Sequence, residues 1–195
     1  MNLETATRET RTMKSFQGHF LVAAPNQLDP NFVEAVVLVI EHGDRGAFGV
    51  IVNCPRKRRD RLSRPRTTKP RRPKGPKPHF GGPVTGPLMA VHRDELFAET
   101  QVLPGVFFAG REKNVLALMR SRGQPCKVFT GYVGWGPGQI EREVDLGIWR
   151  ATAATAAEIF SNGGNLWERL LRRAVDSVLQ VMCNVKHFPS DVSLN

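Results

Sequence analysis

The sequence predicts a single α+β domain. One observation supports the fold class, and two others exclude the alternatives to a globular domain. Short β-branched runs and short helical patterns are interspersed along the chain, without the regular strand-helix-strand alternation of a doubly wound sheet. The 195 residues suit one domain, and 41% apolar against 24% charged residues is typical of globular proteins. The longest clean apolar run, residues 35–40, is too short to span a bilayer. A disordered chain and a membrane bundle are therefore excluded.

The first segment, residues 1–15, is polar and charged, and nothing in it can pack, so we expect a disordered tail. It also lacks the apolar core of a secretory signal. Cys54, Cys126 and Cys183 form no Cys-x-x-Cys spacing, which disfavours a disulfide framework and a zinc site. We therefore expect a cytoplasmic protein without a metal ion or cofactor and without membrane contact.

Three strands are predicted in the first quarter of the chain. Residues 20–24, 35–41 and 47–53 are apolar and rich in β-branched side chains. The turn composition of residues 43–46 joins the last two runs in a hairpin. Between the first two runs, Asp29 is placed to cap a turn or a single helical turn.

Residues 56–77 hold most of the positive charge of the chain. They contain twelve Lys or Arg and one acid, while the rest of the chain has a formal charge of −1. Prolines recur through this stretch, and Leu62 is its only sizeable apolar residue. Because it cannot build a core, we predict an extended, self-repelling loop over residues 56–78 that interrupts a single domain of residues 16–195.

The second half of the chain alternates between strand and helix patterns. Strands are predicted over residues 88–92, 102–109, 126–133 and 148–153, and helices after Glu112, over residues 155–160 and over residues 165–182. The last helix is the clearest, since leucines and other apolar residues recur at i, i+4 and i+8 on one face. Asn165 followed by Glu168 has the form of a capping box. We expect this apolar face to pack on the sheet.

Besides Gly18-His19-Phe20 before the first strand, two glycine clusters stand out, over residues 80–84 and 131–141. Neither has the spacing of a dinucleotide-binding fingerprint or a P-loop. Glycine is the usual residue wherever φ is positive, so tight turns and a ligand-cradling loop both remain open. Pro137 is a residue type that commonly opens a helix.

The second cluster also carries aromatic and polar side chains, which together can form one wall of a pocket. The predicted pocket residues are Gly81, Gly82, Pro83, Tyr132, Gly134, Trp135, Gly138, Gln139 and Glu141, with Asn53 from the third strand. The alternative is that Trp135 is a core anchor and Glu141 a solvated acid in a first helical turn.

No catalytic motif is recognisable. The chain has no Gly-x-Ser-x-Gly elbow and no His-Glu-x-x-His. A thiol nucleophile formed by Cys54 with His42 or His92 is conceivable, but a lone cysteine at a strand end is far more often a buried apolar residue. We therefore expect a protein that is not an enzyme.

Several segments together resemble one family. In order they are Gly18-His19-Phe20-Leu21-Val22-Ala23-Ala24-Pro25, Asp29-Pro30-Asn31-Phe32, Glu41-His42, Gly46-Ala47-Phe48-Gly49-Val50-Ile51-Val52-Asn53, Phe80-Gly81-Gly82-Pro83-Val84 and residues 131–141, GYVGWGPGQIE. Across residues 16–190, apart from the basic stretch, the chain resembles the YqgE/AlgH family of small bacterial proteins. The resemblance implies a bifurcated, mostly antiparallel sheet folded into a pseudo-barrel and flanked by helices.

The resemblance implies less about function. The family's biochemical activity is not established, and members are described as transcriptional regulators without a recognised DNA-binding motif. The chain departs from the family pattern at Cys54, where a basic residue is usual, and at residues 56–77, where an amphipathic helical stretch is usual. We expect a regulatory or small-ligand-binding domain with an unidentified ligand or protein partner.

Three explanations of residues 56–77 stay open: an inert solvated loop, a shift of the reading frame in the gene, or a nucleic-acid-binding arm. An arm without aromatic residues would bind nucleic acid through charge and with little sequence preference. The residues assigned to that arm are Arg56, Lys57, Arg58, Arg59, Arg71 and Arg72.

Overall fold

The structure of the chain is a computed structural model that describes residues 15–53, 78–121, 123–161 and 164–184. The strands in these residues are β1 (His19–Ala23), β2 (Val36–Gly43), β3 (Gly46–Ile51), β4 (His79–Phe80), β5 (Val84–His92), β6 (Thr100–Leu103), β7 (Val106–Ala109), β8 (Cys126–Trp135) and β9 (Trp149–Ala153). The helices are the 3-10 helix η1 (Glu95–Phe97), α2 (Glu112–Arg120), α3 (Gln139–Asp145), α4 (Ala156–Phe160) and α5 (Leu166–Asn184).

Some of the expectations above concern residues outside this described part. They are the tail up to residue 14, the thiol of Cys54, and the basic segment with Arg56, Lys57, Arg58, Arg59, Arg71 and Arg72. These expectations stay predictions.

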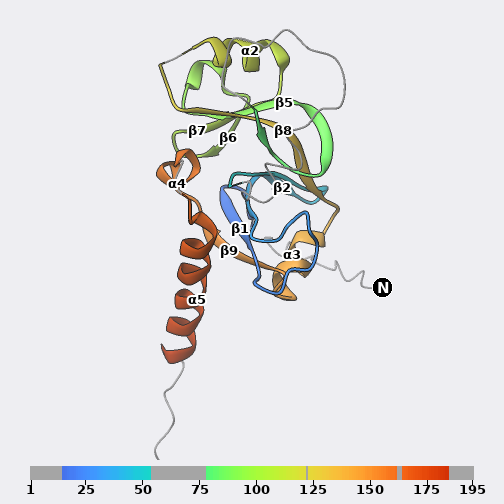
Figure 1. Ribbon diagram of the computed structural model, residues 1–195, viewed down its shortest axis with the longest axis vertical. Coiled ribbons are helices and arrows are strands. Elements are labelled where there is room, and N and C mark those ends of the chain that lie inside the picture. Colours follow the sequence, from blue (N-terminus) through green and yellow to red (C-terminus); the bar gives the residue numbers. More distant parts are fainter. Residues whose placement is uncertain (1–14, 54–77, 122, 162–163, 185–195) are drawn as a thin grey trace, which may run out of the picture.

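The strands form one curled sheet in the order β6-β7-β5-β8-β3-β2-β1-β9, and β4 pairs with β8 off this path (Figure 1). All pairings are antiparallel except the short parallel pairing of β4 with β8. The predicted α+β class and mostly antiparallel sheet are confirmed. The sheet is not closed by a backbone ladder. Instead, the edge strand β6 is tied to β2 by the Thr100 hydroxyl, which donates to a carboxylate oxygen of Glu41 over 3.0 Å.

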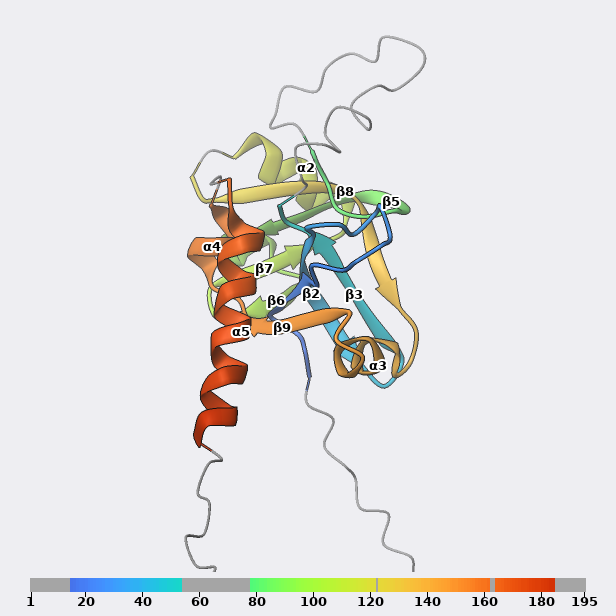
Figure 2. The same ribbon diagram turned by 60° about the horizontal axis from the view of Figure 1, so that its bottom comes forward.

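The apolar side chains gather into three clusters. The first lies inside the curl of the sheet, where α4 and α5 add Ile159, Leu166 and Leu170. The second lies on the outer face of β1, β2, β3 and β9, under α3. The third lies between α2 and the outer face of β5, β7 and β8. Helices α2 and α3 therefore cover separate parts of the sheet, toward opposite ends of the molecule (Figure 2).

Two predicted elements differ from the structure. The strand expected over residues 102–109 is a hairpin of β6 and β7, because Pro104 and Gly105 turn the chain and Gly105 has a φ of 72°. The glycine-rich stretch expected to turn after residue 133 instead continues β8 to Trp135. Glycine in this strand allows close backbone approach, which local sequence patterns do not reveal.

Helix α5 confirms the predicted amphipathic helix to within about two residues at each end. Leu166, Leu170 and Ala174 are buried against the body, while Leu171 is half-buried. Arg173 joins the helix to β9, since its guanidinium donates to the carbonyl of Ala153 over 2.8 Å. The second half of α5 extends past the sheet (Figures 1 and 2). Within the described residues, no helix is long and apolar enough to cross a lipid bilayer.

Candidate functional site

The two predicted glycine segments meet where the chain entering β5 crosses β8. A Cβ atom on Gly81 would lie 2.2 Å from the carbonyl oxygen of Gly131, and one on Gly131 would lie 2.4 Å from that of Gly82. Only glycine permits this approach of two backbones. The Gly81 backbone is also hydrogen-bonded in both directions, to Thr130 and Ile51, over 2.8 Å each. The polar groups of Gly81 therefore hold strands together and do not point toward a ligand.

Beside this crossing, the ring of Tyr132 lies between two further glycines. A Cβ on Gly86 of β5 would come within 3.1 Å of the ring, and one on Gly134 of β8 within 3.4 Å. The ring also makes an edge-to-face contact with Phe48 at 6.4 Å between centroids. Tyr132 is half-buried, and its cross-strand partner Val84 on β5 is exposed, as is Pro83 just before it. Tyr132 therefore presents a partly accessible aromatic ring that is held by rigid backbone.

Tyr132 and Trp135 do not share a wall of one pocket. Both lie on β8, where successive side chains alternate between the faces of the sheet, so residues three apart point in opposite directions. Tyr132 accordingly packs against the cluster inside the sheet, and Trp135 belongs to the cluster under α3. The structure thus divides the predicted pocket residues into two groups.

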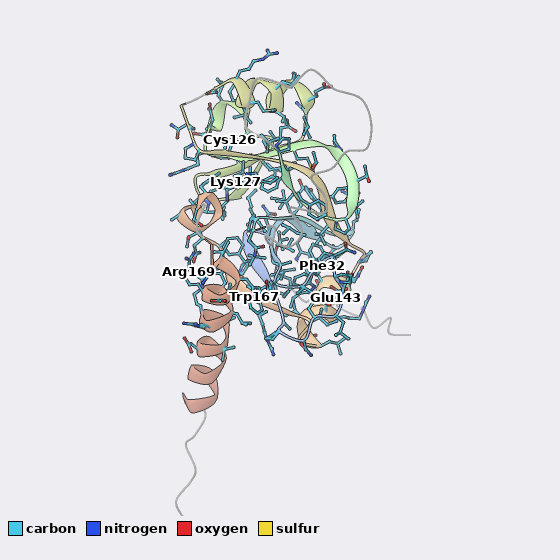
Figure 3. All side chains as sticks on the ribbon, viewed as in Figure 1. Phe32, Cys126, Lys127, Glu143, Trp167 and Arg169 are labelled. Atoms are coloured by element: carbon cyan, nitrogen blue, oxygen red, sulfur yellow. The ribbon has the colours of Figure 1, made fainter. Side chains whose placement is uncertain are left out.

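The second group is organised by Glu143 on α3, a residue that the sequence did not single out. Its Oε2 accepts hydrogen bonds from the indole N–H groups of Trp135 and Trp149, over 2.9 and 2.8 Å. Its Oε1 accepts from the side-chain amide of Gln139 over 2.8 Å. The carbonyl oxygen of that amide accepts from the backbone N–H of Gly136 over 2.9 Å. Figure 3 shows Glu143 beside α3, on the side of the molecule away from α2.

This network makes the turn before α3 rigid. Gly138 begins the helix with a left-handed φ of 67°, which glycine adopts without strain. Trp135 is therefore a core anchor, as the alternative interpretation of the sequence held. Gln139 also has a structural partner at each end of its amide, so neither side chain is available to a ligand without breaking the network.

Glu141, on the same helix, faces His42 of β2. The Nε2 atom of His42 and Oε1 of Glu141 are 2.9 Å apart, and the side chain of His42 is only 2% exposed. Oε2 of Glu141 is buried and has no hydrogen-bond partner within the described residues. Glu141 is therefore not the solvated acid of the alternative interpretation. Its partner, His42, is a contact that only the tertiary structure reveals.

Asn53 lies apart from both groups. Its side-chain oxygen accepts from the backbone N–H of Val36 and its amide donates to the carbonyl of Glu34, over 2.8 Å each. Glu34 has a positive φ of 56°, which is uncommon for a residue with a side chain. Asn53 therefore holds the chain entering β2, and its polar atoms are engaged there.

The described cysteine and histidine residues do not form an activated thiol. Cys126 lies directly opposite His92 in the pairing of β8 with β5, but burial raises the pKa of its thiol to about 11. Burial also lowers the pKa of His92. The backbone of Asp94 and the carboxylates of Asp94 and Glu99 act in the opposite direction, but their effect is smaller. Within the described residues, no group of three or more His, Cys, Asp or Glu side chains is placed to hold a metal ion.

Comparison with solved structures places this architecture in a known class. The chain is similar to the solution structure of the AlgH protein from Pseudomonas aeruginosa, with a TM-score of 0.64 and 24% identity over 94% of this chain and 97% of that one. It is also similar to a crystal structure of a protein from Corynebacterium diphtheriae, with a TM-score of 0.60 and 23% identity over 82% and 87% of the two chains. The class is therefore the AlgH fold.

Sequence comparison then identifies the family. The model described as DUF179, AlgH-like, matches residues 20–178. A UPF0301 protein of Myxococcus xanthus is 32% identical over 180 residues, covering 87% of this chain and 97% of the relative. One from Polaromonas is 34% identical over 158 residues, covering 73% and 79%. One from Chlorobaculum tepidum is 29% identical over 192 residues, covering 91% and 95%. The chain belongs to the AlgH-like family of UPF0301 proteins, which confirms the resemblance seen in the sequence.

Proposed function

We propose that this domain acts in the cytoplasm by binding a small ligand or a protein partner, and that it is not an enzyme. The observation that carries the proposal is the position of Tyr132. Its half-buried ring lies between Gly86 and Gly134, and its cross-strand partner Val84 on β5 is exposed. A rigid aromatic ring with a polar hydroxyl suits an interaction surface, because it offers apolar area at a low cost in conformational entropy. Regulation of transcription, if the domain performs it, would act through a partner bound there.

A fragment screen tests this proposal on the full chain. Small aromatic and heteroaromatic compounds would be screened by saturation-transfer NMR against the wild type and Tyr132→Leu. We expect compounds that bind the wild type and lose binding in Tyr132→Leu. Gly134→Ala, which places a methyl group against the ring, should weaken the same compounds. Leu96→Ala is the matched control, since Leu96 is 82% exposed on η1. Binding that is unchanged in Tyr132→Leu would overturn the assignment of this surface.

The enzymatic alternative has its own test. The wild type would be incubated with p-nitrophenyl acetate and p-nitrophenyl phosphate, with and without prior alkylation by iodoacetamide. We expect no turnover above buffer. Turnover that alkylation abolishes would favour the thiol-dependent alternative, with Cys54 as the residue to replace first.

A nucleic-acid function remains a second candidate because of the twelve basic residues between Arg56 and Lys77. Engagement of six of these cations on duplex DNA would give a slope near −5 for log affinity against log salt, at about −0.9 for each phosphate neutralised. Deletion of residues 56–77 should abolish this binding. Equal binding by the deletion variant would exclude the arm.

A further inference from the structure

Residues 15–18, called here the strap, connect β2 with the edge strand β6, which lies at one end of the curled sheet. The backbone N–H of Gly18 donates to the carbonyl of Val39 on β2 over 3.0 Å. The side-chain amide of Gln17 donates to the carbonyl of Gln101 on the edge strand β6 over 2.8 Å. A Cβ on Gly18 would lie 2.7 Å from the carbonyl oxygen of Val102, so the strap also packs directly on β6. The strap therefore covers part of an edge that the sheet leaves open.

The strap is also attached to His42. The backbone N–H of Phe16 donates to Nδ1 of His42 over 3.0 Å, and the two rings lie 5.5 Å apart. A backbone N–H can only donate, so Nδ1 is an acceptor and carries no proton. The ring proton is therefore on Nε2, where it is donated to Glu141 over 2.9 Å. In this arrangement His42 is neutral.

We propose that His42 is a proton sensor that releases the strap in acid. A second proton can bind His42 only at Nδ1, and a protonated Nδ1 cannot accept the Phe16 N–H. Protonation therefore breaks this attachment and leaves two N–H groups facing each other. The imidazolium keeps its hydrogen bond from Nε2 to Glu141, because that bond does not involve Nδ1. The strap then keeps the contacts of Gln17 and Gly18 with the sheet, and the Phe16 carbonyl still accepts from the N–H of His19 on β1 over 3.0 Å.

Few other charged or titratable groups of the described residues lie near His42. His19 contacts the same Phe16 ring, with centroids 6.3 Å apart. Asp44 and Arg45 follow His42 in the turn between β2 and β3, and Glu41 is bonded to Thr100 of β6. Glu141 is the one charged group hydrogen-bonded to the ring within the described residues.

His19 supplies an internal contrast. Its Nδ1 is 3.1 Å from the carbonyl oxygen of Gln17, which can only accept. Nδ1 of His19 is therefore a donor, and protonation of the ring leaves this contact intact. Two histidines beside the same strap should consequently respond to acid in different ways.

NMR of the full, uniformly ¹⁵N-labelled chain tests the proposal between about pH 5 and 8, where histidines usually titrate. At neutral pH we expect the ring nitrogens of His42 to report the tautomer protonated at Nε2. As His42 gains a proton, the protection of the Phe16 amide against hydrogen exchange should fall about fivefold or more, because one hydrogen bond is lost. The exchange rates are first corrected for their intrinsic dependence on pH. A ring protonated at Nδ1 at neutral pH, or protection that does not change as the ring titrates, would overturn the proposal.

Three variants separate the sensor from general effects of acid. His42→Asn keeps an acceptor near the position of Nδ1 and does not titrate, so Phe16 should stay protected throughout the range. His42→Gln places its amide nearer to Glu141, so Phe16 should be less protected at every pH. His19→Gln is the control and should leave the response of the wild type unchanged. A response that persists in His42→Asn or disappears in His19→Gln would refute His42 as the sensor.

Discussion

On the α3 side of the sheet, the carboxylate of Glu143 accepts hydrogen bonds from two indole N–H groups and one side-chain amide. On the α2 side, the imidazole of His92 is fully buried, yet neither ring nitrogen has a hydrogen-bond partner within the described residues. Both groups lie in outer layers of the same sheet. One has its polar atoms satisfied and the other does not.

A buried polar group stabilises the fold when its hydrogen bonds are made and destabilises it when they are not. A carboxylate with several donors holds neighbouring elements together, because removing it leaves each donor without a partner. Through Glu143, α3 is bound to the end of β8 and the start of β9. An imidazole without partners loses its hydration and gains no hydrogen bond in return. His92 contributes its contacts, such as the Phe107 ring at 6.2 Å, and a weaker electrostatic interaction with Asp94 and Glu99 that lacks hydrogen-bond geometry.

The largest expected effect is that of Glu143→Ala. It leaves the N–H groups of Trp135 and Trp149 buried without an acceptor and frees Gln139, so we expect a loss of about 3 to 5 kcal/mol in the free energy of unfolding. Urea unfolding measures this loss. Glu143→Gln is the control and should lose roughly half as much, since its amide oxygen still accepts. A loss below about 1 kcal/mol for Glu143→Ala would show that the carboxylate does not hold this face together.

A smaller effect of opposite sign is expected for His92→Leu. Leucine has a similar size and no polar atoms to desolvate, so we expect a gain of about 1 kcal/mol in the free energy of unfolding. The same urea experiment measures it at neutral pH. Destabilisation by more than about 1 kcal/mol would mean that His92 has a partner that compensates for its burial.

The pH dependence of stability sharpens the comparison further. The folded-state pKa of His92 lies below its ordinary value of 6.5, so the unfolded chain binds this proton first as the pH falls. Stability linked to His92 is therefore complete above about pH 6.5 and is lost on acidification below it. Urea midpoints of the wild type and His92→Leu, compared at about pH 7.5 and 5.5, should diverge in acid. A constant difference would show that His92 titrates alike in the folded and unfolded states.

The smallest expected signal is the reactivity of Cys126, beside His92. A thiol with a pKa of about 11 is roughly one part in a thousand thiolate at pH 8, so alkylation in the native state should be slow. Iodoacetamide labelling, followed by mass spectrometry of the Cys126 peptide, would be compared with and without urea. Rapid native labelling would indicate that the α2 side is open to solvent.

Much of the fold follows from short-range patterns in the sequence. The β-branched runs predicted β1, β2 and β3, and the leucine repeat predicted α5. The candidate site was predicted less completely. Alternation along a strand separates Tyr132 from Trp135, but this consequence requires knowing that residues 131–135 are a strand. Glu143 was not singled out, because its two indole partners lie outside its own helix, eight residues before it and six after it.

The helix starts show which features the sequence alone determines. Helix α4 begins at Thr155, whose hydroxyl oxygen accepts from the N–H of Glu158 three residues on, so this start is encoded locally. Helix α2 has no such cap. The chain entering it is instead held by Glu99, which accepts from the N–H groups of Gly110 and Arg111 and precedes them by eleven and twelve residues.

The same distinction applies to the whole protein. Sequence by itself determined the fold class, the family, most strands and the amphipathic α5, because these depend on neighbouring residues and on a repeating apolar pattern. Tertiary structure decided the contact of Glu141 with His42, the three donors to Glu143, the isolation of His92 and the fastening of the strap. Each of these depends on the distance and direction between polar atoms, most of them in different elements of the fold, which only the folded backbone determines.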